Sequence, residues 1–165
     1  MPKFKEFLYF IPLVLIISVN LWTGINIRNS LSEIIFFILT MILVGFLEEI
    51  IFRGFLFKMM EKDNVNIAII VTSLTFGIGH ILNLFNGADL IPTLLQICYA
   101  IAGGYLFVII FHKGKSLWPC IVTHSAVNAL SIFSVDNLVT LYVVPVFLVI
   151  VSVSYAWYIK YEIQN

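Results

Sequence analysis

The chain has 165 residues, of which 61% are hydrophobic and only 11% are charged, and its nine Lys and Arg residues balance nine Asp and Glu residues. A soluble domain carries about 25% charged residues, so this composition excludes a soluble or fibrous protein and indicates an integral membrane protein. The balanced charge gives no indication of a nucleic-acid partner. At roughly 20 residues per crossing, we expect one integral membrane domain over residues 1–165 with at most six or seven spans.

Six apolar stretches follow one another along the chain, and each is long enough, or nearly long enough, to span a bilayer. They cover residues 7–22, 31–46, 67–85, 90–111, 116–133 and 138–158. The first resembles a secretory signal, but it lacks a small-residue cleavage site, so we expect a transmembrane helix there. Hydrocarbon does not tolerate lipid-exposed irregular backbone, and the alternating pattern of barrel strands is missing. We therefore predict an all-α bundle of about six transmembrane helices.

Two of these stretches begin with recognisable helix starts. Ser30 and Glu33 form a capping-box pattern ahead of the second stretch, in which each side chain can satisfy a free backbone N–H group. We expect the same helix to continue beyond the membrane-length run toward Met60. Trp118 and Pro119 suit the start of the fifth stretch, with the indole at the membrane interface and the proline in the first helical turn.

The basic residues predict the orientation of the chain in the membrane. If six spans begin with the N-terminus inside, eight of the nine Lys and Arg residues fall on the cytoplasmic side and only Arg28 lies outside. Cytoplasmic loops carry the excess of Lys and Arg, so we predict that both termini are cytoplasmic. The eight residues are Lys3, Lys5, Arg53, Lys58, Lys62, Lys113, Lys115 and Lys160.

Ionisable side chains within membrane segments each cost about 2.5–3.5 kcal/mol or more, and they indicate a functional site by default. The four positions are Glu48, Glu49, His80 and His124. Glu48 lies ten residues before Lys58 and His124 nine residues after Lys115, which places both about 14–15 Å from the cytoplasmic side. His80 reaches a similar depth if the connection over residues 62–66 runs along the surface. We expect one polar pocket that is open toward the cytoplasmic half.

Spacing within the segments predicts which polar side chains share a helix face. Glu49 and Arg53 are four residues apart and can pair, whereas Glu48 points about 100° away from Glu49. His124 and Asn128 are also four apart, so an imidazole and a carboxamide can donate hydrogen bonds to the same small target. Taken singly, each group is more often structural, as an ion pair or a contact between helices. Their alignment at one depth favours a functional site.

Two glycines lie just before His80 in the sequence. Gly77 and Gly79 remove side-chain bulk beside His80. We therefore expect a neighbouring helix, or the backbone of a substrate, to approach closely at this point.

Three motifs, in this order on three membrane segments, resemble those of the CPBP family of intramembrane proteases. This family is named after CAAX proteases and bacteriocin-processing enzymes, is also called Abi, and includes the type II CAAX prenyl endopeptidases. The motifs are Glu48-Glu49-x-x-x-Arg53, Phe76-x-x-x-His80 and His124-x-x-x-Asn128. Phe52-Arg53-Gly54 completes the family's first motif, and Trp118-Pro119 precedes the third as in many members. The resemblance covers a catalytic core over residues 31–130.

The resemblance implies an enzyme that hydrolyses peptide bonds within the bilayer. Its partners would be the lipid bilayer and a membrane-associated or lipidated peptide or protein, which the sequence does not identify. By the same resemblance, Glu48 would activate the attacking water with His80 as its partner. Glu49 and Arg53 would support them.

The resemblance assigns the binding of the oxyanion to His124 and Asn128. It leaves the metal open, because both metalloprotease and metal-free glutamate mechanisms are argued for this family. Two histidines and one carboxylate form a set that a catalytic zinc accepts, and the candidate ligands are Glu48, His80 and His124. The His-Glu-x-x-His motif of helical zinc proteases is absent from the sequence.

Two other functional classes remain open from the sequence. The buried carboxylates and histidines could form a proton or ion relay in a transporter, although internal repeats and paired broken helices are missing. A non-catalytic immunity or peptide-binding protein could also keep the pocket, since members of the CPBP family are linked to bacteriocin self-immunity. Cleavage of a substrate by the purified protein would separate the protease from both.

Overall fold

The computed structural model describes residues 10–162, and these form helices joined by short connections without any strand. This confirms the predicted all-α class. The six main helices are α2 (Ile11–Ser18), α3 (Leu31–Glu49), α5 (Val65–Ile78), α7 (Leu90–Gly114), α8 (Trp118–Leu130) and α9 (Val144–Glu162). Shorter helical segments are η1 (Val19–Leu21), η2 (Ile50–Phe57), α4 (Lys58–Met60), η3 (Gly79–Ile81), α6 (Leu82–Phe85), η4 (Ser131–Phe133) and η5 (Val139–Val143).

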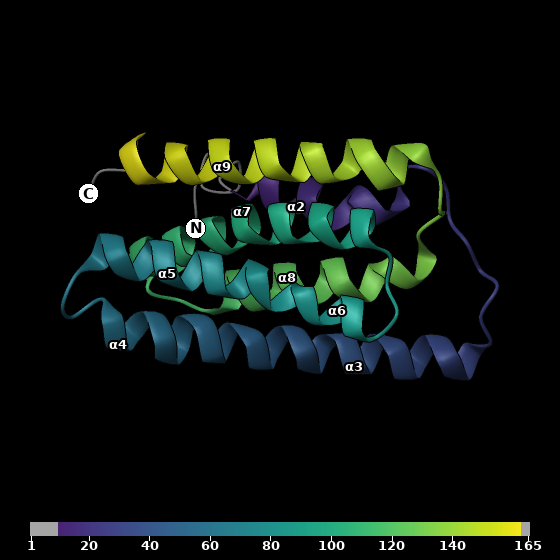
Figure 1. Ribbon diagram of the computed structural model, residues 1–165, viewed down its shortest axis with the longest axis horizontal. Helices are drawn as coiled ribbons and strands as arrows, with labels where there is room; N and C mark the ends of the chain where they lie inside the picture. Colours follow the sequence, from purple (N-terminus) through teal and green to yellow (C-terminus); the bar gives the residue numbers. More distant parts are fainter. Residues whose placement is uncertain (1–9, 163–165) are drawn as a thin grey trace, which may run out of the picture.

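The main helices run side by side in one bundle (Figure 1). α3 and α9 form opposite sides, and α5, α7 and α8 lie between them (Figure 1). α7 packs against both α5 and α9, while α8 packs against α3 and α2. The second half of α7 contributes much of the core, because Leu106, Val108 and Ile109 are buried there.

Four segments of the described chain are long and apolar enough to cross a membrane. They are Leu31–Met60, Val65–Phe85, Leu90–Gly114 and Val139–Tyr161. The first predicted span, residues 7–22, contains only the shorter apolar helix Ile11–Leu21 within the described residues. The fifth, residues 116–133, is also too short, because α8 begins only at Trp118 and its last turn tightens into η4. Four of the six predicted spans are thus long enough by themselves to cross a membrane, and the described parts of the other two form shorter helices.

The helix that begins at Leu31 continues without a break to Met60, as predicted. The Ser30 side chain accepts a hydrogen bond from the Glu33 N–H, and the Glu33 carboxylate accepts one from the Ser30 N–H, which forms the expected capping box. Beyond Glu49 the backbone changes from α-helix to the π-helix η2. Large apolar side chains such as Phe36, Leu43 and Phe55 are exposed along this helix, which suits contact with lipid.

Glycine allows α5 to approach α7 closely. A Cβ atom on Gly77 would meet the Ile101 side chain and lie 2.7 Å from the Ile101 nitrogen and 2.9 Å from the Ile97 oxygen. A Cβ atom on Gly79 would meet nothing within 4 Å in the described structure. The expected approach of a neighbouring helix therefore occurs at Gly77 and does not occur at Gly79.

These two glycines provide a matched test of helix packing. We expect Gly77→Ala to destabilise the protein by about 1–3 kcal/mol, because backbone atoms of α7 cannot move away from the added methyl group without shifting the helix. Gly79→Ala has open space around it and should leave the unfolding temperature in detergent nearly unchanged. Equal unfolding temperatures for the two variants would contradict the close α5–α7 contact.

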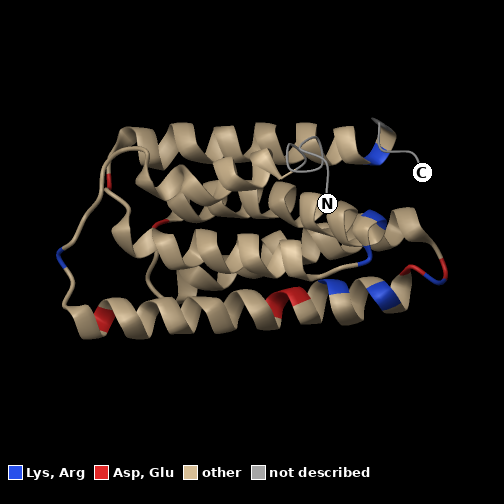
Figure 2. Cartoon of the chain, turned by 180° about the vertical axis from the view of Figure 1, so that it is seen from behind, with Lys and Arg blue, Asp and Glu red and all other residues tan. Residues whose placement is uncertain are grey.

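Basic residues gather at one end of the bundle (Figure 2). The turn after α4, the C-terminal end of α7 and the last turn of α9 meet at this end (Figure 1), and they carry Lys62, Lys113 and Lys160. Arg28 lies in the connection before α3, at the opposite end. Lys3 and Lys5 lie outside the described residues. The asymmetry on which the orientation was predicted is therefore present among residues 10–162.

The predicted orientation can be tested by cysteine labelling. Both ends of the bundle offer an exposed position, Asp136 near the start of η5 and Gly114 at the end of α7. In a variant without Cys98 and Cys120, we expect a cysteine at residue 136 to react with an impermeant reagent from outside the cell. A cysteine at residue 114 should react only after the membrane is opened. The reverse pattern would overturn the prediction that the basic end is cytoplasmic.

Candidate active site

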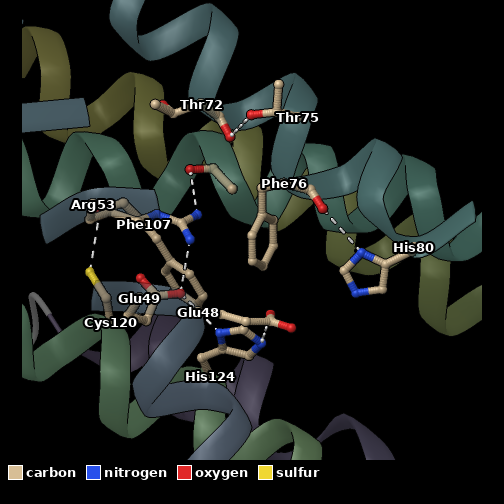
Figure 3. Close-up of polar contacts among 11 residues, drawn as sticks. Glu48, Glu49, Arg53, Thr72, Thr75, Phe76, His80, Phe107, Cys120 and His124 are labelled. Carbon is tan, nitrogen blue, oxygen red and sulfur yellow. Dashed lines mark hydrogen bonds and ion pairs between the residues drawn. The ribbon is translucent and has the colours of Figure 1, made fainter. Parts of the chain in front are cut away.

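The candidate site lies where side chains of α3, of the following segment η2 and of α8 meet (Figure 3). Glu48 and Glu49 form the end of α3, and Arg53 follows in η2. His124 faces them from α8. Four of the six predicted site residues are thus in direct contact, and the remaining two are His80 in η3 and Asn128, one turn beyond His124 in α8.

A fully buried ion pair forms the base of the site. The Arg53 Nη1 atom lies 3.0 Å from the Glu49 Oε1 atom, and both side chains have no exposed surface. The Arg53 Nη2 atom donates a hydrogen bond of 3.1 Å to the Gly104 carbonyl oxygen on α7. The guanidinium carbon also lies 4.4 Å from the centroid of the Phe76 ring. The predicted Glu49–Arg53 pair is therefore present, and a cation–π contact and a backbone carbonyl help to compensate the buried charge.

His124 lies between the two adjacent glutamates. Its Nδ1 atom is 2.9 Å from the Glu49 Oε1 atom, and its Nε2 atom is 3.6 Å from the Glu48 Oε2 atom. An ionised carboxylate only accepts hydrogen bonds, so beside an ionised Glu49 the Nδ1–H group is the donor and Glu49 Oε1 the acceptor. Glu49 thereby fixes the orientation of the imidazole ring. Sequence reasoning missed this role, because it considered only the local partner Arg53 and not a residue 75 positions away.

Exposure distinguishes the two glutamates. The Glu48 side chain is 34% exposed, whereas the Glu49 side chain is completely buried. Consecutive helical residues point about 100° apart, so Glu49 reaches Arg53 while the Glu48 side chain points away from it. Glu48 is therefore the carboxylate of this pair that an entering molecule can reach.

His80 and His124 pack against the same aromatic ring. The Phe76 ring makes T-shaped contacts with both imidazoles (Figure 3), with its centroid 5.6 Å from the His80 ring and 5.5 Å from the His124 ring. The His80 Nδ1 atom lies 3.2 Å from the Phe76 carbonyl oxygen, to which it donates. Among the described residues, His80 forms no hydrogen bond or ion pair with Glu48. In this structure the histidine beside Glu48 is His124.

Asn128 lies one helical turn beyond His124 on α8. Its backbone oxygen accepts hydrogen bonds from the Ser131 hydroxyl, at 2.7 Å, and from the Ser131 N–H. Its half-buried side-chain amide makes no hydrogen bond within residues 10–162. The amide is thus available as a donor near His124, although the two side chains are not in contact.

The residues considered as zinc ligands do not form a ligand set in this structure. Within the described part of the chain, no three His, Cys, Asp or Glu side chains are close enough together to hold a metal ion. One ring nitrogen of each histidine is already engaged, because the Nδ1 atom of His124 faces Glu49 and the Nδ1 atom of His80 is bound to the Phe76 carbonyl oxygen. A catalytic zinc needs three protein ligands around one point, and Glu48, His80 and His124 do not surround one.

Aromatic and small residues complete the site, and sequence reasoning gave them no role. Phe107 on α7 lies 6.0 Å from the His124 ring and 5.5 Å from the Arg53 guanidinium carbon. Gly45 allows α8 to approach α3, because a Cβ atom there would lie 2.8 Å from the Ser125 nitrogen. Gly104 leaves room for the Phe76 ring, because a Cβ atom on Gly104 would lie only 3.1 Å from Phe76. The one signal in the sequence was the presence of glycines inside long apolar runs.

The comparison with known families agrees with the motifs. The family model described as "Type II CAAX prenyl endopeptidase Rce1-like" matches residues 30–130, which extend from the cap of α3 to the end of α8 and include all six predicted site residues. The chain has no significant match among curated proteins or among solved structures. Since the family match covers more than half of the chain, this membrane protein belongs to the Rce1-like family of type II CAAX prenyl endopeptidases.

Proposed function

We propose that this protein hydrolyses a peptide bond of a lipidated or membrane-associated substrate, with Glu48 as the general base. One observation carries the proposal: Glu48 is the partly exposed carboxylate in a charged group whose other members are buried. Glu49, Arg53 and His124 are held by one another and by the bundle. An accessible base on a rigid, paired support is the arrangement that general base catalysis requires.

In the proposed reaction, Glu48 accepts a proton from a water molecule as the water oxygen bonds to the carbonyl carbon of the substrate. The carbonyl oxygen becomes an oxyanion. When the C–N bond breaks, Glu48 gives the proton to the leaving amine, so that the products are an acid and an amine and Glu48 is again ionised. A positioned base of this kind contributes about 10²–10⁴-fold to the rate.

His80 would act on the same water rather than on Glu48 directly. Its Nδ1–H is engaged by the Phe76 carbonyl oxygen, so in a neutral ring the Nε2 atom is an acceptor. A water molecule between Glu48 and His80 could then donate one hydrogen to each. The absence of a direct contact between Glu48 and His80 in the described structure is compatible with this role.

His124 and Asn128 are proposed to bind the oxyanion. With both ring nitrogens protonated, His124 would balance one of the two glutamates while Arg53 balances the other, which leaves the buried group without net charge. The Nε2–H bond would then be free to donate to the oxyanion, and the unpaired amide of Asn128 would be the second donor.

Asn128→Ala tests this assignment. We expect kcat to fall by about 10²–10³-fold with little change in KM, because an oxyanion donor acts mainly in the transition state. The exposed Asn66 in α5 provides the control, and Asn66→Ala should leave both constants unchanged. If Asn128→Ala instead raised KM at constant kcat, Asn128 would be a contact to the ground-state substrate.

The proposed activity itself can be tested with purified protein in liposomes. We would use an internally quenched, farnesylated peptide that ends in a CAAX sequence, together with the same peptide without the lipid. Cleavage is expected, and mass spectrometry of the products would identify the bond that is broken. Comparison of membrane peptides from cells with the wild-type protein and with Glu48→Gln would identify the natural substrate. Failure of the wild-type protein to cleave any peptide in either experiment would overturn the proposal and favour a binding or transport role.

A further inference from the structure

Asn20 connects the N-terminal helix to the helix that carries His124 and Asn128. It lies in η1, directly after α2, and its Nδ2 atom donates a hydrogen bond of 2.7 Å to the carbonyl oxygen of Val127 on α8. The two residues are 107 positions apart. Asn20 also lies outside residues 30–130, the range matched by the family model.

The Val127 oxygen needs such a partner because of how α8 ends. In a continuing α-helix, the N–H group of Ser131 would donate to the Val127 oxygen. Here the Ser131 N–H donates to the Asn128 oxygen, since the chain tightens into the 3₁₀ turn η4. The Val127 oxygen therefore loses its α-helical partner at the end of the helix. In a membrane protein an unsatisfied carbonyl is costly, and the amide of Asn20 satisfies this one.

Asn128 is held on both sides by this arrangement. The peptide group that precedes it carries the Val127 oxygen, which is bound to Asn20. Its own oxygen is bound by the hydroxyl and the N–H of Ser131. The direction of the Asn128 side chain depends on both peptide groups, so a change at Asn20 alters where the Asn128 amide points.

A second backbone contact strengthens the connection between the two segments. The Asn26 N–H donates a hydrogen bond of 2.9 Å to the carbonyl oxygen of Phe133, at the other end of η4. The segment from Asn20 to Asn26 thus contacts the chain on both sides of η4. α2 itself packs along α8.

We propose that Asn20 is a positioning residue for the hydrolytic site: it holds the end of α8 so that the Asn128 amide can donate to the oxyanion. The proposal rests on the proposed function of Asn128 and adds a part of the site that lies outside the family match. Asn20 does not itself touch the reacting atoms. It acts through the Val127 carbonyl group.

The test combines Asn20→Leu with Asn128→Ala. Leucine has a similar size and keeps the packing of η1, but it cannot donate a hydrogen bond. With the farnesylated CAAX peptide as the probe, we expect Asn20→Leu to lower kcat by about tenfold with little change in KM, as for the loss of one hydrogen bond. In the Asn128→Ala background, Asn20→Leu should have less than about a twofold further effect, because residues that act as a unit are not additive.

Thr23→Val is the matched control within the same segment. The Thr23 hydroxyl is hydrogen-bonded to the Thr140 hydroxyl at 2.9 Å, which ties this segment to η5 and not to α8. We expect kcat of Thr23→Val to equal that of the wild type. A tenfold loss in this variant would mean that any loosening of the segment lowers activity, and it would overturn the specific role of Asn20.

Hydrogen–deuterium exchange provides a measurement that does not depend on activity. We expect the amides of residues 128–133 to exchange faster in Asn20→Leu than in the wild type and in Thr23→Val. Faster exchange with unchanged kcat would show that Asn20 only caps the helix, and unchanged exchange would show that the contact does not hold α8. Additive effects in the double variant would also overturn the proposal. If the wild-type protein cleaves nothing, the proposed function fails and the catalytic role of Asn20 fails with it, while the exchange data still report whether Asn20 holds α8.

Discussion

Replacement of Glu48 by Gln should abolish peptide cleavage and leave the amount of folded protein unchanged. Glutamine keeps the shape of the side chain but cannot accept a proton from water, and a positioned base is worth about 10²–10⁴-fold. Because the Glu48 side chain is 34% exposed, its replacement by an amide of the same shape leaves the buried Glu49–Arg53 pair in place. The rate of cleavage of the quenched peptide and the yield of monodisperse protein after purification measure the two effects.

A second carboxylate provides the control for this experiment. Glu61, in the turn after α4, forms an ion pair of 3.1 Å with Lys58 at the basic end of the bundle. Burial raises the pKa of Glu61, but hydrogen bonds from Lys58 and His112 and the charges of Lys58 and Lys115 outweigh this, so its pKa lies below its ordinary value. Glu61→Gln should retain full activity. Full activity of Glu48→Gln with normal yield would refute Glu48 as the general base.

Arg53→Ala should lower both the abundance and the activity of the protein. The substitution leaves the Glu49 carboxylate and the Gly104 oxygen without their buried partner. Removing one member of a buried ion pair costs about 3–5 kcal/mol. We expect a marked fall in the unfolding temperature in detergent and in the steady-state amount in membranes. In contrast, Lys58→Ala removes an exposed pair with Glu61 and should change the stability by less than about 1 kcal/mol.

A paired substitution separates the structural contribution of the ion pair from its contribution to activity. Arg53→Met combined with Glu49→Gln removes both charges and keeps most of the volume, so it should recover much of the stability lost in Arg53→Ala. It should remain inactive, because glutamine replaces the carboxylate that contacts the Nδ1 atom of His124 and orients its ring. Wild-type stability of Arg53→Ala, or activity of the double variant, would contradict the role assigned to the Glu49–Arg53 pair.

The π-helix η2 begins directly after the two glutamates and contains Arg53. Such segments are rare in helices and are frequent at functional sites. Here the wider turn occurs where one helix must present three charged side chains toward α7 and α8. Nothing in the local sequence distinguishes this stretch from an ordinary α-helix, which is why the sequence predicts one continuous helix.

The sequence by itself determined the features that depend on composition and on helix periodicity. The membrane class follows from the apolar composition, and the all-α fold follows from the need to satisfy backbone groups within each segment in lipid. The capping box at Ser30 and the Glu49–Arg53 pair involve residues three or four positions apart. The rise and twist of a single helix are enough to predict such contacts.

The tertiary structure decided which helix faces meet. The position of His124 between Glu48 and Glu49, the contact of the Phe76 ring with His124, and the bond from Asn20 to Val127 all join segments far apart in the chain. These contacts depend on the rotation of each helix about its axis and on the distance between helices. Small residues such as Gly45 and Gly77 set that distance through backbone contacts across the bundle. Periodicity within one segment indicates which of its residues share a face, but not which helix packs against that face. For this reason the sequence could predict the residues of the site but not their pairing.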